Sequence, residues 1–333
     1  MNAETCRGIK DAKFWQSLVS GRLSKMIEAV NSDPELVLQF RNNYMNVYYH
    51  SGSVAKISSE RSVDISENYF ISCDKENYIR NKEKQTEEDK ARHKALIKRR
   101  DEVKDMFYAG NYKEYFNMMK DTMDKHWSYC HHDIELEDEG DVQQKLCALN
   151  QYESKGSRYA IIDLEHEVSI NADFAYKGET PFPKKDKKGN IIPKIKPRFD
   201  IVAVDKKTGQ LFIWELKKGI GALEGPSGMH DHVDSYIHTV KENQEAERSF
   251  VEEIEHILMQ KQILGLVDKR IKIDMLQEVQ FGFVYSYSDE ATNATKQQAE
   301  KEIVESLRRE IRGGISIADY PMIYLKPKDY TLK

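Results

Sequence analysis

Two runs of mostly apolar residues, separated by a short polar turn, form the clearest pattern in the chain. They cover residues 199–205 and 210–217, and the turn 206–209 ends on glycine. Apolar side chains fill most positions of both runs, as in strands that lie inside a sheet. A four-residue connection between such runs predicts a β-hairpin.

Charged residues interrupt this hairpin at Asp200, Glu215 and Lys217. If Asp205 pairs with Gln210, the register places Asp200 across from Glu215, with Cβ atoms roughly 4.5–5.5 Å apart. Lys217 follows two residues later, so it projects from the same face. Two carboxylates and an ammonium suit a divalent cation beside a phosphate. The alternative is a set of cross-strand salt bridges worth a few tenths of a kcal/mol, but charges in apolar strands are costly unless they are paired or serve chemistry.

The surrounding pattern predicts an α/β arrangement. The predicted elements are a helix over 141–153, a strand over 159–168, a long helix over 229–264, a strand over 278–286, a helix over 293–312 and a short strand over 322–325. Gly313 and Gly314 are expected to stop the last helix. Residues 218–228 are rich in Gly and Pro, which excludes regular structure there. Glu165 and Glu167 are expected on the solvent face of an edge strand.

The first 130 residues are predicted to form a separate, mostly helical module. Its elements are a helix over 15–30, a hairpin over 45–50 and 54–57, a strand over 62–72 and an exposed helix over 81–106. Tyr48, Tyr49 and His50 are suited to stack on bases or, as tyrosines more often do, to fill the core. We interpret residues 1–130 as a regulatory or substrate-presenting module and 131–333 as the domain that carries the chemistry.

The hairpin residues Arg198-Phe-Asp200 and Glu215-Leu-Lys217 resemble the signature of the PD-(D/E)XK nuclease superfamily. Phe199 stands where the formal motif has proline. The order of predicted elements over residues 136–287 also follows the superfamily's α-β-β-β-α-β core. The resemblance implies a restriction-endonuclease-like α/β fold, a mixed central sheet flanked by helices, with an α+β region before it.

The resemblance also implies a function, the Mg²⁺-dependent hydrolysis of phosphodiester bonds in nucleic acid, with DNA favoured and Mn²⁺ as an alternative cofactor. Asp200, Glu215 and the carbonyl of Leu216 would bind the metal, because Mg²⁺ prefers oxygen ligands. Lys217 would orient the attacking water or offset transition-state charge. The superfamily often adds a glutamate from the preceding helix, for which Glu139 is the first choice and Glu137 the second.

RecB-type members of the superfamily carry Gln-x-x-x-Tyr on the helix after the motif. The corresponding residues are His232 and Tyr236, with histidine in place of glutamine. Residues four apart share a helix face, so both are expected beside the metal or the phosphate. The alternative for His232 is an ordinary, partly buried histidine near a helix start.

A basic segment over residues 184–198 precedes Asp200. Its cations, expected to bind the nucleic-acid backbone, are Lys184, Lys185, Lys187, Lys188, Lys194, Lys196 and Arg198. Such contacts would depend on salt through counterion release. The alternative is a solvated surface loop.

Composition bounds these interpretations. The chain has 333 residues, a formal net charge of −5 and four scattered cysteines, which favours a reducing cytoplasm. No apolar run has a membrane-spanning length, so a membrane partner is not expected. Many superfamily enzymes act as dimers, and a homodimer is compatible with this sequence. Two rival functions remain: a catalytically inactive nucleic-acid-binding or structural protein with the same fold, and an enzyme acting on a small phosphorylated ligand.

Overall fold

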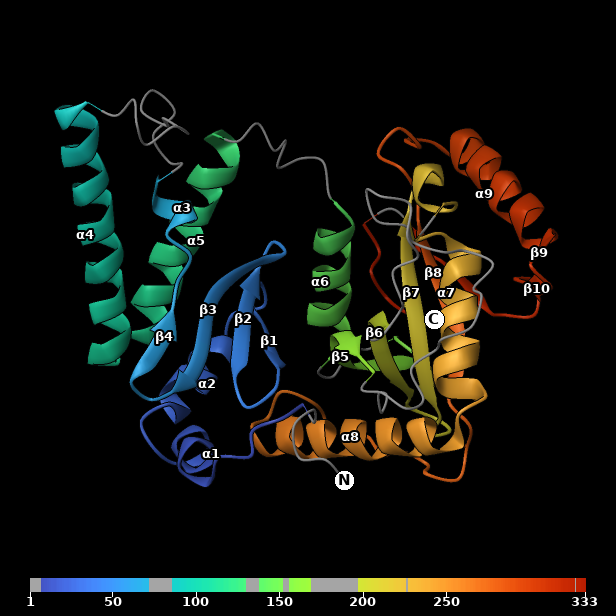
Figure 1. Cartoon of the computed structure of the whole chain (residues 1–333), viewed down its shortest axis with the longest axis horizontal. Helices are drawn as coiled ribbons and strands as arrows, with labels where there is room; N and C mark the ends of the chain where they lie inside the picture. The colour runs from blue at the N-terminus through green and yellow to red at the C-terminus, as the bar shows by residue number, and fades with distance from the viewer. Residues whose placement is uncertain are drawn as a thin grey trace, which may run out of the picture. The chain divides into compact units, whose positions relative to one another are not determined.

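The structure of the chain is a computed structural model that describes residues 7–71, 86–129, 138–151, 156–168, 197–225, 227–326 and 328–333 (Figure 1). The described residues form two compact units, one over 7–140 and one over 141–333. The expected domain boundary lies at 130, whereas the units divide at 140. Helix α6, Glu139–Asn150, begins just before this division.

The first unit combines an antiparallel sheet with helices. The four strands follow the order β1-β2-β3-β4. They are β1 Val37–Phe40, β2 Met45–Tyr49, β3 Gly52–Ser59 and β4 Ser62–Asp64, and the helices are α1 Ala12–Val19, α2 Ser24–Asn31, α3 Asn68–Ile71, α4 Glu87–Ala109 and α5 Tyr112–Tyr129. Helices α4 and α5 lie side by side (Figure 1).

The predicted hairpin of this unit is confirmed. Strands β2 and β3 pair, and His50 and Ser51 between them have φ of 43° and 60°, as a two-residue hairpin turn requires. The single helix expected over 15–30 is wrong, because the chain breaks it into α1 and α2 around Gly21, where a side chain would collide with the Ser17 backbone. The strand expected over 62–72 is only β4, and α3 follows it. Strand β1 and helix α5 were not predicted.

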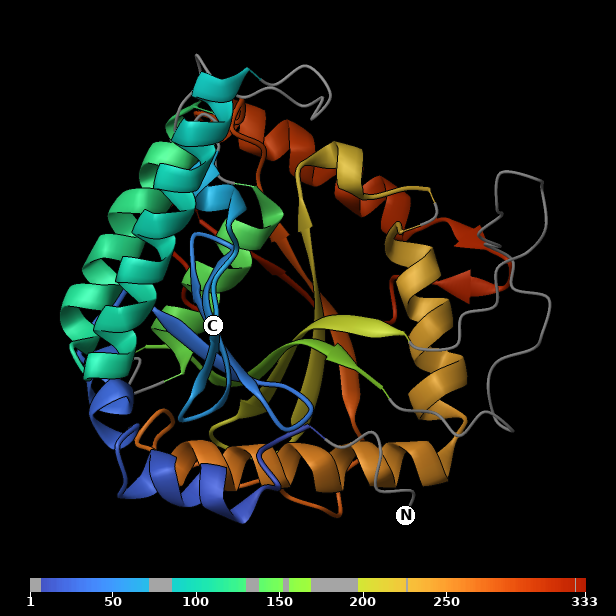
Figure 2. The same cartoon turned by 60° about the vertical axis from the view of Figure 1, so that its left-hand side comes forward.

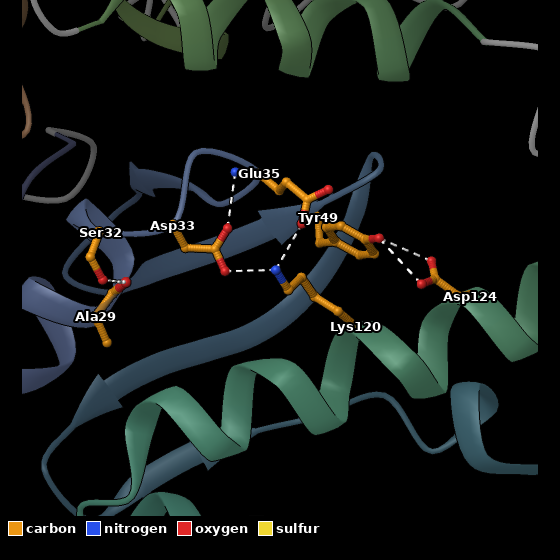
Figure 3. Close-up of polar contacts among 7 residues, drawn as sticks. All are labelled: Ala29, Ser32, Asp33, Glu35, Tyr49, Lys120 and Asp124. Carbon is orange, nitrogen blue, oxygen red and sulfur yellow. Dashed lines mark hydrogen bonds and ion pairs between the residues drawn. The ribbon is translucent and has the colours of Figure 1, made fainter.

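Several polar contacts of the first unit join α5 to β2 and to the segment after α2 (Figure 3). The ammonium of Lys120, on α5, lies 2.7 Å from Oδ2 of Asp33 and 2.8 Å from Oε2 of Glu35. The hydroxyl of Tyr49 donates to Oδ1 of Asp124, 3.1 Å away. Tyr49 is buried on β2, so the structure assigns it to the core of this unit. These contacts link α5 to the sheet and to the segment after α2.

The second unit contains a mixed five-stranded sheet in the order β11-β8-β7-β6-β5 (Figure 2). Its strands are β5 Tyr159–Glu167, β6 Arg198–Asp205, β7 Leu211–Lys218, β8 Gln280–Ser286 and β11 Met322–Tyr324, beside a two-stranded ribbon of β9 Ile311–Arg312 and β10 Ile315–Ser316. Strands β5, β6 and β7 are antiparallel, and β8 runs parallel to β7 and β11. This is an α/β unit, as expected, and β5 is an edge strand.

Helices of the same unit flank this sheet in Figure 2. Besides α6, they are α7 Met229–Tyr236, the π-helical turn η4 Ile237–Lys241, α8 Gln244–Ile263 and α9 Ala294–Arg308, with the short 3₁₀ turn η3 Ile220–Ala222. The sheet core is aromatic: Phe212 and Trp214 stack with centroids 5.1 Å apart, and Tyr159 packs edge-on against both. The strands expected over 159–168, 278–286 and 322–325 are thus present as β5, β8 and β11.

The predicted register of the β6–β7 hairpin is confirmed. Ile201 pairs with Trp214, and the Asp205 N–H donates to the Gln210 carbonyl over 2.9 Å. Gly209 closes the turn with φ of 78°, a conformation that favours glycine. A side chain there would also approach the Asp274 backbone to 3.0 Å. The turn thus determines which residues of the two strands face each other.

Three predicted features of this unit are wrong. The long helix over 229–264 is interrupted, because Asn243 leaves helical geometry and its side chain accepts the Ala246 N–H as the cap of α8. Gly313 and Gly314 do not stop a helix; α9 ends at Arg308 and the glycines, with φ of 57° and 82°, turn the β9–β10 ribbon. Residues 218–228 contain the turn η3.

Helices of membrane-spanning length and apolarity are absent from the described part of the chain. Cys147 is a buried free thiol on α6. Cys6, Cys73 and Cys130 lie outside the described residues.

Candidate functional site

Asp200 and Glu215 form the centre of the candidate site. Beyond the pair Ile201–Trp214, the same register sets Asp200 across from Glu215. The Leu216 N–H donates to Oδ2 of Asp200 over 2.9 Å, which holds this carboxylate against β7. Glu215 is fully buried, whereas Asp200 is partly exposed. The two acids therefore share one face of the sheet, with one of them accessible to a ligand.

The electrostatics of Asp200 reflect this arrangement. Burial raises the pKa of Asp200 well above its usual value, and the negative charge of Glu215 raises the pKa further. Lys217 and His232 act in the opposite direction. Two neighbouring carboxylates in a poorly solvated place resist ionising together unless a cation joins them. The pair is thus suited to bind positive charge.

Lys217 and His232 lie beside these acids. The Lys217 ammonium is 3.9 Å from Oε2 of Glu215 and is almost completely buried, on the same strand face. Nδ1 of His232, on α7, is 3.0 Å from the same Glu215 oxygen. The structure therefore brings four predicted site residues together, from two strands and a helix.

Tyr236 is not part of this group. Its hydroxyl donates to the carbonyl of Val279 over 2.6 Å, and its ring stacks on Phe281 with centroids 4.9 Å apart. Val279 precedes β8, at the end of the sheet away from Glu215, which is level with Phe283. The structure does not place Tyr236 beside His232 and the acids as expected, because its side chain packs in the aromatic core.

Gln143, which was not predicted, and Glu165, which was expected to face solvent, lie beside this group. Gln143, on α6, donates from Nε2 to the carbonyl of Asp200 over 2.7 Å and to Oε1 of Glu165 over 3.1 Å. Pairs on either side, Leu164–Ile201 and His166–Phe199, put Glu165 level with Asp200. Glu167 is exposed as expected, but Glu165 belongs beside the site. Its position depends on the register of β5, which shifts between Ile161 and Asp163, so the sequence alone could not reveal it.

The remaining predicted residues have different positions. Leu216 reaches Asp200 through its N–H. Glu139 is the first residue of α6, and its role as a ligand stays a prediction. Arg198 is exposed at the start of β6. Outside the described residues lie Glu137, Lys184, Lys185, Lys187, Lys188, Lys194 and Lys196.

A buried polar cluster lies elsewhere in the same unit, between β5 and α8. Nδ1 of His166 is 2.7 Å from Oδ2 of Asp163, and its Nε2 is 3.7 Å from Oε2 of Glu253. Both His166 and Asp163 are fully buried. A register shift in β5 between Ile161 and Asp163 accompanies this arrangement. Strict alternation along β5 could not predict it.

The carboxylate oxygens at the site can be compared with the ligands that a divalent metal prefers. Carboxylate oxygens from Asp200 and Glu215 are the ligands that Mg²⁺ prefers, and Mg²⁺ commonly takes only one or two carboxylates, with waters and phosphate oxygens in its other positions. Within the ranges that the structure describes, no group of three or more His, Cys, Asp or Glu side chains converges in metal-binding geometry. Two carboxylates thus match the small number of protein ligands that Mg²⁺ commonly takes.

Compared with protein-family models, curated proteins and solved structures, the chain matches none of them.

Proposed function

We propose that this protein is a metal-dependent nuclease of the PD-(D/E)XK type, hydrolysing phosphodiester bonds in nucleic acid, with DNA as the favoured substrate. The observation that carries the proposal is the placement of Asp200, Glu215 and Lys217 on one face of β6 and β7, in the expected register. The mixed sheet with β8 parallel to β7 is compatible with a restriction-endonuclease-like core. The raised pKa of Asp200 supports a cation between the two acids.

Each residue has a role in this proposal. A bound Mg²⁺ would polarise the phosphate and lower the pKa of the attacking water. Asp200 and Glu215 supply the oxygens that hold the ion. Lys217 stands within 3.9 Å of Glu215, where its ammonium can offset charge that develops on the phosphate. His232 fixes the orientation of the Glu215 carboxylate through Nδ1.

The second candidate is a catalytically inactive nucleic-acid-binding or structural protein with the same fold. The carboxylates already have internal partners: the Leu216 N–H for Asp200, and His232 for Glu215. A chain that had lost activity but kept the fold would also satisfy its acids internally, and it would bind nucleic acid or a protein without cutting. The partly exposed Asp200 and the buried Lys217 support the active enzyme.

Calorimetric titration with Mg²⁺ or Mn²⁺ separates these functions before any substrate is known. The active site predicts heat of binding in the wild-type protein that is lost in Asp200→Asn. The matched control is Asp205→Asn at the other end of β6, a buried acid that pairs with Arg158 over 2.6 Å and should leave metal binding intact. Equal heat in all three proteins would contradict the assignment of the metal to Asp200.

A further inference from the structure

Arg198, one of the cations expected from the sequence to bind the nucleic-acid backbone, forms an ion pair on the same stretch of sheet as the carboxylates, and its partner Glu165 has no role in the proposed mechanism. Nε of Arg198 is 2.6 Å from Oε2 of Glu165, and the two side chains are 62% and 32% exposed. Arg198 precedes Asp200 by two residues on β6, so both project from the same face. A ligand that reaches Asp200 along this face therefore also meets the Arg198 guanidinium.

Glu165 is held in place rather than resting loosely on the surface. Gln143 donates to its Oε1 over 3.1 Å and, from the same nitrogen, to the carbonyl of Asp200 over 2.7 Å. The φ of 53° at Glu165 is a conformation that non-glycine residues adopt at a cost, and that surrounding contacts must maintain. Glu165 thus presents its other oxygen to Arg198 from a fixed position.

In this pair the Glu165 carboxylate takes the position at Arg198 that a phosphate group could take. Carboxylate and phosphate oxygens both accept from the planar guanidinium, so Glu165 occupies Arg198 much as a phosphate would. Exposed ion pairs are weak. An arginine–phosphate contact with nucleic acid gains in addition from counterion release. A backbone phosphate can therefore displace the carboxylate.

We propose that Arg198 binds a backbone phosphate of the substrate, and that Glu165 orients the guanidinium and lowers its affinity until the phosphate replaces the carboxylate. The inference rests on the proposed function for its ligand class. It assigns to Glu165 a positioning role that acts on binding and needs no metal. Glu165 and Arg198 would then set how tightly nucleic acid is held beside Asp200.

Binding in EDTA tests this without cleavage. Fluorescence anisotropy of a fluorescein-labelled DNA duplex, DNA single strand or RNA strand would be followed with Glu165→Gln, Arg198→Gln and the double variant. Glu165→Gln should tighten binding about threefold, the scale of an exposed ion pair. Arg198→Gln should weaken binding and reduce the slope of log affinity against log salt by about one. The double variant should behave like Arg198→Gln.

Glu167→Gln is the matched control, because it removes the same charge from the same strand. Glu167 is exposed and lies directly opposite Arg198 in the strand register, yet the arginine pairs with Glu165. Tightening by Glu165→Gln alone, dependent on Arg198, supports the inference. Equal tightening by both glutamate variants, or tightening that persists without Arg198, overturns it.

The outcomes also distinguish this inference from the proposed function. A protein that cleaves nucleic acid in Mg²⁺ but binds it equally well as wild type and as Glu165→Gln would refute the role of Glu165 alone. A protein that neither binds nor cleaves DNA or RNA would refute the proposed function, and the phosphate contact with it.

Discussion

The two compact units differ in how many Asp, Glu, His, Lys and Arg side chains they bury. Among the described residues, the buried polar and charged side chains of the first unit are Arg7, Ser17, Gln39 and Thr122. In the second unit the buried Asp, Glu, His and Lys residues are Asp141, Asp163, His166, Asp205, Glu215, Lys217, His230, Asp231, Asp234, Glu253, Lys261 and Glu300. Burying charge is costly unless it is paired or used, so its concentration marks the second unit as the place to look for chemistry.

Polar clusters in the two units also differ in their surroundings. In the first unit, Lys120 meets Asp33 and Glu35, and the Glu35 side chain is 55% exposed (Figure 3). In the second unit, Glu215 meets His232 and Lys217 while fully buried itself. Water reaches Glu35 in the first cluster, although the Lys120 and Asp33 side chains are only 15% and 19% exposed, and it is excluded from Glu215 in the second. The contacts of the first cluster should therefore contribute less energy than those of the second.

The largest effect on stability is expected from the cluster between β5 and α8. Asp163→Ala would leave the buried His166 without its 2.7 Å partner and open a cavity. Removing one member of a buried polar pair should lower the free energy of unfolding by about 3 kcal/mol. Urea denaturation measures this, with the exposed Glu167→Gln on the same strand as control. A loss below about 0.5 kcal/mol would show that the cluster does not contribute as a buried pair.

The next effect concerns turnover. Lys217→Met should reduce cleavage about a hundredfold or more, because it removes a positive charge positioned for the transition state, while binding of DNA is retained. Lys218→Met is the matched control. Lys218 is the adjacent residue, and it pairs with Asp289 over 2.9 Å. Single-turnover kinetics and anisotropy would separate the two steps. Parallel loss of binding and cleavage in a folded Lys217→Met protein would contradict this role.

A smaller effect is expected on the pH dependence of stability, with opposite signs at the two ends of β6. Burial and the charge of Glu215 raise the pKa of Asp200, so the folded state holds this proton longer than the unfolded state does. Stability of the metal-free protein should therefore fall as pH rises from the ordinary aspartate range through the raised pKa. Asp200→Asn should remove this fall, and thermal unfolding in EDTA across pH would show it.

For Asp205, the expected change of stability with pH has the opposite sign. Although burial opposes the effect, the Lys207 N–H and the Arg158 guanidinium lower the pKa of Asp205. Its contribution is therefore present above the ordinary aspartate pKa and is lost as pH falls through the lowered value. Asp205→Asn should lower the free energy of unfolding at neutral pH. In acid, the variant and the wild type should differ less in stability. If the free energy of unfolding changed with pH in the same way in Asp200→Asn and in Asp205→Asn, neither pKa shift would govern the pH dependence of stability.

The smallest effect is expected in the first unit. Lys120→Met should change the free energy of unfolding by about 1 kcal/mol or less, because the ion pairs to Asp33 and Glu35 are partly solvated. The change should also diminish with added salt. Urea denaturation at low and high salt would measure it. A loss as large as that of Asp163→Ala would erase the contrast between the two units.

Local pattern predicted the hairpin and its register well. The turn 206–209 and the apolar runs on either side determine a single register, which pairs Ile201 with Trp214 in the core. The same register places Asp200 across from Glu215. The sequence pattern could not show features that depend on irregular backbone or on tertiary packing. Glu165 lies opposite Asp200 because the register of β5 shifts between Ile161 and Asp163. Asn243 divides a segment whose apolar pattern suggested one helix, and Tyr236 joins the aromatic core although its spacing from His232 suggested the site.

The most direct test of the central claim is incubation of the wild-type protein and Glu215→Gln with linear, circular and single-stranded DNA, and with RNA, in Mg²⁺, Mn²⁺ or EDTA. The account predicts cleavage by the wild type that requires metal and is lost in the variant, with circular DNA distinguishing internal from terminal cutting. Cleavage that survives Glu215→Gln, or no cleavage of any substrate together with no heat of metal binding, would contradict it.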